Sequence, residues 1–246
     1  MKKVIVVVPC YNEEKRLNSE KFQAFVSEAR DIGFLFVNDG STDGTSQIIR
    51  SLQDRHPYDF TALDLPHNVG KAEAIRQGIL KAMEQGPEYV GMWDADLSTP
   101  LTEIPRFVGV LDADGHVETV FGARVRLMGR CIERAAVRHY LGRFAATLIS
   151  WTLGITVYDT QCGAKLFRVG EKTRKVFQEP FSTSWIFDVE VLARLIANGS
   201  RTDRGTEIYE LPLNEWIHTG DSKLRPLDYL IALRDLYVIH RKYISS

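Results

Sequence analysis

The sequence predicts an α/β fold with a mostly parallel central sheet and helices on both faces of the sheet. Short apolar runs alternate with helical patterns along the first half, and a polar cluster follows each of four runs. The first run, Val4–Val8, is almost entirely β-branched and ends at Pro9. Such a run is typical of a strand that is buried on both faces of a parallel sheet.

The elements of the first half follow in a regular order. Strands are expected over residues 4–8, 34–37, 60–65, 89–93 and 118–121. Helices are expected over residues 13–30, 43–52 and 70–83, where apolar residues recur at spacings of three and four. This alternation of strand and helix predicts parallel strands joined by crossover helices.

The second half is less regular. We expect helices over residues 129–151, 187–197 and 224–243, and strands over 163–168 and 207–213. No low-complexity linker and no internal repeat separates the two halves. We therefore predict a single domain over residues 1–246, made of a 1–97 half and a 98–246 half.

Composition excludes several classes of protein. The chain has 246 residues, of which 44% are hydrophobic and 26% are charged, with a formal net charge of −1. This charge gives no overall attraction to nucleic acid. Three widely spaced cysteines form no disulfide framework, so we expect a reducing, cytoplasmic location. No segment approaches the roughly 20 apolar residues that span a bilayer.

The sequence lacks several common nucleotide-binding, nucleophile and zinc-binding motifs. Gly70-Lys71 is followed by Ala72 where a phosphate-binding loop requires Ser or Thr. The first strand is followed by PCYNEE and not by a GxGxxG motif, and no GxSxG nucleophile motif is present. The six histidines have no zinc-ligand spacing.

Asp94 and Asp96 follow the fourth strand with one residue between them. Side chains at i and i+2 of a strand point the same way, so these carboxylates would repel unless a cation lay between them. Their oxygens suit Mg²⁺ or Mn²⁺. The alternative is a solvated turn in which Asp96 caps a helix. Thr99-Pro100 offers a better helix start, which favours the metal site.

Asp39 lies in a similar position after the second strand, in NDGSTDGT. It is either a turn residue or a carboxylate that accepts the N–H of a pyrimidine base. Ser41 or Thr42 is expected to cap the next helix, which leaves Asp39 unneeded for capping.

The motifs VVPCYNEE, FVNDGSTDGT, NVGKAEAIRQGI and MWDADLSTP, in this order, resemble those of the inverting family 2 glycosyltransferases with a GT-A fold. The later segments GARVR, DTQCGAKLFR, WIFDVEVL and NEWIHTGDSKL resemble the polyprenyl-phosphate sugar transferases. Within that group the similarity is closest to the dolichyl-phosphate β-glucosyltransferase type, with the mannosyltransferases next. It covers nearly the whole chain.

This resemblance implies a nucleotide-sugar-binding half over 1–97 and an acceptor-binding half over 98–246. It implies that the nucleotide sugar is bound by Pro9, Tyr11, Glu13, Asp39, Lys71, Asp94 and Ala95. Asp94 and Asp96 would hold Mg²⁺ or Mn²⁺ on the diphosphate, and Asp96 would act in catalysis. The metal would neutralise the charge that develops on the leaving diphosphate.

The acceptor side can be argued from arginines. Arg124 and Arg126 follow the fifth strand, and Arg130, Arg134 and Arg138 recur every four residues in the helix expected there. The simple alternative is a solvated face of a core helix. Because arginine binds phosphate in a bidentate manner, we assign Arg124, Arg126, Arg130 and Arg134 to the phosphate of a lipid acceptor. The apolar faces of that helix would meet the lipid or the bilayer surface.

Three further residues stand where the family has functional groups. Asp159 and Asp188 are candidate catalytic acids, but Asp188 also suits the first turn of a helix and Asp159 suits a turn. A phosphate acceptor is already anionic and needs no strong general base. Lys223 is either a second phosphate ligand or a surface lysine.

The sequence thus predicts an inverting hexosyltransferase that moves glucose from UDP-glucose to a polyprenyl or dolichyl phosphate. GDP-mannose is the second donor candidate. The alternatives are transfer to a saccharide hydroxyl in cell-surface polysaccharide synthesis, and a nucleotide-sugar binding protein without catalysis. The chain starts at its first strand and ends at Ser246. We therefore expect peripheral contact with the inner face of the membrane.

Overall fold

A seven-stranded sheet forms the centre of the computed structural model, which describes residues 1–133, 136–199, 206–217 and 226–245. The strand order is β3-β2-β1-β4-β7-β5-β8. Only β7 runs antiparallel to its neighbours β4 and β5, so the predicted mostly parallel sheet is confirmed. The strands are β1 (Val4–Cys10), β2 (Ile32–Asp39), β3 (Phe60–Leu65), β4 (Tyr89–Met92), β5 (Thr119–Ala123), β7 (Lys165–Arg168) and β8 (Ile208–Pro212).

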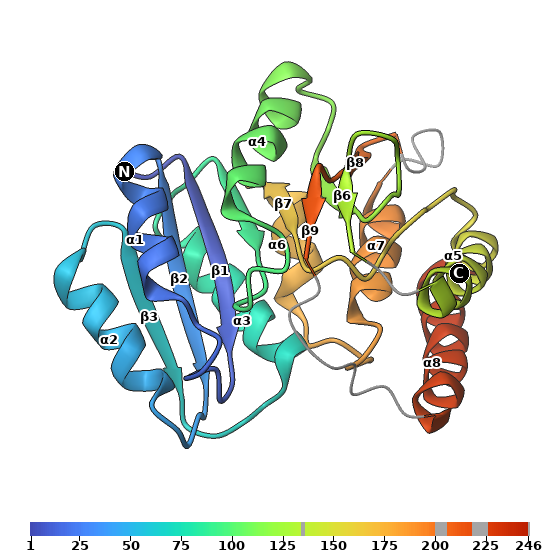
Figure 1. The fold of residues 1–246 in the computed structure, drawn as a ribbon. Helices are drawn as coiled ribbons and strands as arrows, with labels where there is room; N and C mark the ends of the chain where they lie inside the picture. The colour runs from blue at the N-terminus through green and yellow to red at the C-terminus, as the bar shows by residue number, and fades with distance from the viewer. Residues whose placement is uncertain (134–135, 200–205, 218–225, 246) are drawn as a thin grey trace.

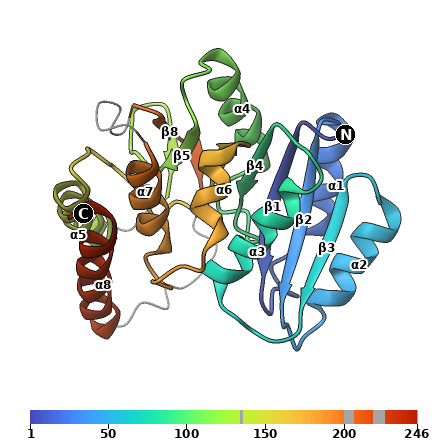
Figure 2. The same ribbon diagram turned by 180° about the vertical axis from the view of Figure 1, so that it is seen from behind.

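Helices cover both faces of this sheet (Figures 1 and 2). Alternate residues of β1 divide between two apolar cores: Val6 packs into the core beneath α1, α2 and α4, and Val7 into the core beneath α3, α6 and α7. The helices are α1 (Ser19–Glu28), α2 (Thr45–Arg55), α3 (Lys71–Met83), the short η1 (Leu101–Glu103), α4 (Ile104–Ala113), α5 (Ala136–Leu153), α6 (Glu171–Gln178), α7 (Phe187–Asn198), α8 (Pro226–Ile239) and η3 (His240–Ile244).

Three predicted helix starts are wrong. The helix expected from residue 13 begins at Ser19, because Asn18 accepts a hydrogen bond from the Lys21 amide and caps it. Neither Ser41 nor Thr42 caps α2, since Asp43 Oδ1 accepts from the Thr45 amide. Thr99 caps no helix, because the first helical turn after it is η1 and starts at Leu101.

Within the described residues, the helix expected over 129–151 is α5, Ala136–Leu153, and residues 129–133 are not helical. Before it, β6 (Cys131–Ile132) pairs with β9 (Glu215–Trp216) in a second, two-stranded sheet. This long-range pairing fixes the segment in an extended form that its helical pattern did not indicate. No helix within the described residues is long and apolar enough to cross a membrane.

Candidate functional site

The carboxyl ends of β1, β2 and β4 meet at one edge of the sheet, because these strands are parallel and adjacent. Pro9 belongs to β1. The loop after β1 is hydrogen-bonded to the segment that follows β2. The Asn12 amide donates to Ser41 Oγ (3.1 Å), and the Glu13 amide donates to Thr45 Oγ1 (2.8 Å). Tyr11, which directly precedes Asn12, is exposed. This edge is where an open α/β sheet binds its ligand.

Asp94 and Lys71 form an ion pair at this edge. Lys71 Nζ at the start of α3 lies 2.6 Å from Asp94 Oδ1 just beyond β4. Burial alone would raise the pKa of Asp94, but the ammonium of Lys71 together with the charges of Lys165 and Arg124 outweighs burial and lowers that pKa. A Cβ atom on Gly163 would lie 1.9 Å from Asp94 Oδ2, so only glycine leaves room for this carboxylate.

Asp96 and Glu13 place further carboxylate oxygens near Asp94. Asp96 Oδ1 accepts from the Ser98 amide (2.9 Å), so Asp96 also shapes its own turn. Glu13 Oε1 pairs with Arg16, whereas Glu13 Oε2 is buried and has no hydrogen-bond partner among the described residues. Burial raises the pKa of Glu13, and the charges of Asp96 and Asp94 add to the rise despite Arg16.

Asp94, Asp96 and Glu13 are the candidate ligands for a divalent ion at this edge of the sheet. Their oxygens are the donors that Mg²⁺ and Mn²⁺ prefer. Among the described residues, no three Asp, Glu, His or Cys side chains are close enough to hold an ion by themselves. The all-oxygen donor set therefore fits an ion that two of these carboxylates hold and that takes its remaining ligands from a bound phosphate group, next to the unpaired Glu13 Oε2.

Asp39 is buried and holds a loop. Its two oxygens accept hydrogen bonds from the Val69 and Gly70 amides, at 2.7 and 3.0 Å. Asp39 thereby fixes the turn that leads to Lys71. Recognition of a base by Asp39 stays a prediction.

Asp188 belongs to a second buried ion pair. The sequence indicated Asp188 but not its partner, Lys165. Lys165 Nζ at the start of β7 lies 2.5 Å from Asp188 Oδ1 in the first turn of α7. Burial raises the pKa of Asp188, although Lys165 and Lys71 oppose the rise. We missed Lys165, which is completely buried. The signal available was a lysine that opens an apolar run, KLF.

Arg124 and Asp159, predicted to have separate roles, are paired. Arg124 Nε and Nη2 donate to the two oxygens of Asp159, at 2.6 and 2.8 Å, and the Arg124 amide donates to Oδ2. The Arg124 guanidinium also lies 5.2 Å from the centre of the Trp216 ring. Despite burial, Asp159 raises the pKa of Arg124 further above its usual value. Asp159 thus orients a cation, while its catalytic role stays a prediction.

The predicted row of arginines along one helix is wrong, because Arg130 does not belong to a helix. Arg130 precedes β6 and donates to the Pro212 carbonyl (2.6 Å) and to Asn214 Oδ1 (2.9 Å). Arg126 is exposed in the loop after β5. Arg134 and Lys223 lie outside the described residues. Ala95 is buried between the two aspartates.

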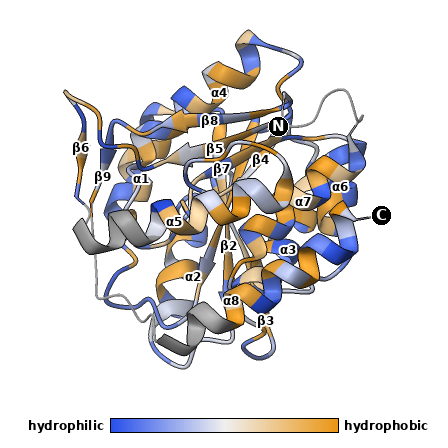
Figure 3. Ribbon diagram, turned by 90° about the vertical axis from the view of Figure 1, so that its right-hand side faces the viewer, coloured by the Kyte–Doolittle hydropathy of each residue, from blue (hydrophilic) through white to orange (hydrophobic). Residues whose placement is uncertain are grey.

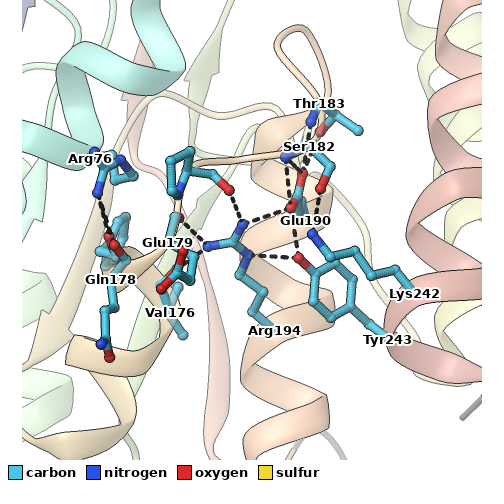
Figure 4. A network of polar contacts seen from close by, with 12 residues as sticks. Arg76, Val176, Gln178, Glu179, Ser182, Thr183, Glu190, Arg194, Lys242 and Tyr243 are labelled. Carbon is cyan, nitrogen blue, oxygen red and sulfur yellow. Dashed lines mark hydrogen bonds and ion pairs between the residues drawn. The ribbon is translucent and has the colours of Figure 1, made fainter.

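A polar network fixes the segment that leads into α7 (Figure 4). Arg194 donates to the carbonyls of Val176, Glu179 and Pro180 and pairs with Glu190 Oε1 at 2.8 Å. Glu190 in turn accepts from the Ser182 and Thr183 amides. The network therefore sets the start of the helix that carries Asp188.

Comparisons with known proteins agree with this geometry. Residues 5–170 match the family described as glycosyl transferase family 2. A dolichyl-phosphate beta-glucosyltransferase from Trichomonas vaginalis is 33% identical over 89% of this chain, and the match covers 65% of that protein. The dolichyl-phosphate beta-glucosyltransferase of Homo sapiens is 30% identical over 100% of this chain and 77% of its own length.

Solved structures agree on the fold. Glucosyl-3-phosphoglycerate synthase from Mycobacterium tuberculosis, in complex with Mn²⁺, UDP-glucose and phosphoglyceric acid, superposes with a TM-score of 0.68 at 19% identity. The superposition covers 98% of this chain and 80% of that one. The fold is therefore GT-A, and the chain belongs to glycosyl transferase family 2.

Proposed function

We propose that the protein transfers glucose from UDP-glucose to the phosphate of a polyprenyl lipid of the dolichyl type, with inversion at the sugar C1. The names of the relatives support the sugar and the acceptor. The observation that carries the proposal is the convergence of three carboxylate–cation pairs at one edge of the sheet: Asp94–Lys71, Asp188–Lys165 and Asp159–Arg124.

On the donor side, Asp94 and Asp96 would hold a divalent ion together with the diphosphate, and the unpaired Glu13 Oε2 would lie beside it. Such an ion neutralises the charge that develops on the leaving group. Mn²⁺ in the structure of the mycobacterial synthase supports this use of a metal. Lys71 would move from Asp94 toward the diphosphate, because a phosphate oxygen competes for the same ammonium.

On the acceptor side, Arg124 has a fixed orientation, because its guanidinium donates hydrogen bonds to both carboxylate oxygens of Asp159. Arg124 and the exposed Arg126 would bind the acceptor phosphate. The phosphate oxygen attacks C1 without prior loss of a proton, since it is already anionic near neutral pH. Asp188, held by Lys165, would orient the sugar.

The test is release of UDP from UDP-glucose with Mn²⁺ and a short-chain polyprenyl phosphate, with GDP-mannose in a parallel reaction. Asp96→Asn should abolish release. Asp188→Asn should slow transfer to the lipid phosphate without abolishing it. Complete loss in Asp188→Asn, together with turnover on a saccharide, would replace the lipid acceptor by a hydroxyl acceptor. Binding of UDP-glucose without any release of UDP would leave a non-catalytic binding protein.

A further inference from the structure

Large apolar side chains are exposed together on one side of the molecule. On α5, Phe144 and Trp151 are 70% and 84% exposed, and they lie seven residues apart on one helix face. On α8, Leu233 and Tyr237 are 52% and 61% exposed and lie four residues apart. Exposed apolar side chains that gather in this way mark an interaction site.

The two helices form one continuous surface. Figure 3 looks onto this side, where α5 and α8 lie in front of the rest of the molecule. A groove of about 400 Å³ runs between them, lined mainly by apolar and aromatic side chains. Its lining residues are Leu148, Trp151, Thr152, Leu233, Leu236, Tyr237 and His240. We call Phe144, Trp151, Leu233 and Tyr237, with this groove, the α5–α8 surface.

The charged side chains near the α5–α8 surface are mostly basic. Over residues 142–157 and 231–245 the basic side chains are Arg143, Arg234, Arg241 and Lys242. The one acidic residue in these ranges is Asp235, which is buried and pairs with Arg234 at 2.7 Å, so the unopposed positive charge comes from Arg143, Arg241 and Lys242. Exposed Trp, Phe and Leu combined with Arg and Lys at the rim is the composition of helices that lie in the interface of an anionic bilayer.

The α5–α8 surface is also connected to the active site. Arg234 and Asp235 of α8 border a pocket whose other walls include Gly70, at the start of α3, and Ser182. From η3, Lys242 Nζ donates to Ser182 Oγ (2.7 Å), and Tyr243 Oη donates to Glu190 Oε1 (2.9 Å) (Figure 4). The helix that carries part of this surface, α8, therefore also borders the segments that lead to Lys71 and Asp188.

From these observations we infer that the α5–α8 surface docks on an anionic lipid bilayer, with Phe144 and Trp151 inserted at the headgroup level and the basic rim against the lipid phosphates. This inference rests on the proposed function in one respect, namely that the acceptor is a lipid.

The test uses the full chain and vesicles of phosphatidylcholine with about 30% phosphatidylglycerol, measured by co-sedimentation. The double variant Phe144→Ser, Trp151→Ser should lower the partition coefficient about tenfold or more. Arg241→Gln should lower it about fivefold on these vesicles and leave binding to pure phosphatidylcholine unchanged. Tyr58→Ser, which removes an exposed aromatic side chain in the turn before β3, is the matched control and should bind as the wild type does.

Folding of each variant is checked by its thermal midpoint. Trp151 gives a second readout, because its emission should shift to the blue on vesicle addition and the shift should vanish in Trp151→Phe. Unchanged sedimentation of a folded double variant, or no sedimentation of the wild type, would overturn the inference. A concentration-dependent dimer that the double variant abolishes, without vesicle binding, would instead assign the surface to a second copy of the chain.

The two proposals fail separately. Transfer of glucose to a short-chain, water-soluble acceptor needs no bilayer. Such transfer without vesicle binding would overturn the docking surface alone. Vesicle binding that depends on Phe144 and Trp151, without transfer of glucose, would overturn the proposed function alone.

Discussion

At the scale of single residues, the site depends on cations that hold carboxylates in place. Lys71, Lys165 and Arg124 each contact one aspartate. A buried carboxylate without such a partner would take up a proton. Pairing lowers the pKa of Asp94 and opposes the rise in the pKa of Asp188. It also orients the three carboxylates before a donor arrives, which reduces the reorganisation needed during the reaction.

Gly163→Ala tests how closely Asp94 is positioned. The new Cβ would lie 1.9 Å from Asp94 Oδ2, so the carboxylate must move. We expect kcat/KM for UDP-glucose to fall about a hundredfold, because a displacement of about 1 Å costs that much. The control is Gly109→Ala in α4, where an added Cβ meets no atom within 4 Å. Equal activity of the two variants would show that Asp94 is not needed in its present position.

Arg126→Ala tests the acceptor assignment. The side chain is exposed in the loop after β5, so its removal should leave the fold intact. We expect KM for the polyprenyl phosphate to rise about tenfold, because one charge-assisted contact is lost, while KM for UDP-glucose changes less than about twofold. Arg174→Ala, on the exposed side of α6, is the control. An equal rise of both KM values would place Arg126 outside the acceptor site.

At the scale of elements, the start of α7 is fixed by the buried Glu190–Arg194 pair. Burial would raise the pKa of Glu190, but hydrogen bonds from Ser182 and the contact with Arg194 outweigh it and lower that pKa. The folded state therefore binds this proton less readily than the unfolded state does. The resulting stability is present above the usual pKa of 4.5 and is lost as the pH falls through the lowered value.

Glu190→Gln should accordingly lower the free energy of unfolding by about 3 kcal/mol near neutral pH, because Arg194 is left buried without its counter-charge. The deficit relative to the wild type should shrink as the pH falls below 4.5. Urea unfolding at neutral and acidic pH measures both effects. Glu84→Gln, in a solvent-exposed pair with Lys81, should cost less than about 1 kcal/mol. A deficit that does not change with pH would contradict the electrostatic explanation.

At the scale of the whole molecule, the central sheet joins the two halves of the chain. β7 inserts between β4 and β5, and its residue Leu166 pairs with Gly91 on one side and with Val120 on the other. The donor-binding strands therefore depend on residues far along the sequence. The predicted division at residue 97 therefore does not separate the central sheet into two parts.

We expect thermal unfolding to occur in a single transition, with the same midpoint by circular dichroism and by tryptophan fluorescence. UDP-glucose with Mn²⁺ at about 100 times its Kd should stabilise the whole chain by about 2.7 kcal/mol and shift that one transition. Two transitions, of which the ligand shifts only the first, would show that residues 1–97 fold by themselves.

The sequence alone determined the order of strands and helices, the edge of the sheet where polar clusters gather, and the family. These properties depend on local hydrophobic periodicity and on short motifs. Prediction from the sequence failed where the local pattern and the long-range pairing disagree. Arg130 was assigned to a helix, but it directly precedes β6, which pairs with β9.

Only the tertiary structure decided which charges meet. Lys71 reaches Asp94 across 23 residues of sequence, Lys165 reaches Asp188 across 23, and Arg124 reaches Asp159 across 35. The positions of Lys165 and Arg124 depend on the antiparallel insertion of β7, which neither propensity nor periodicity specifies. The same holds for the α5–α8 surface, because the sequence gives each helix an apolar face but only packing decides which part of that face stays exposed.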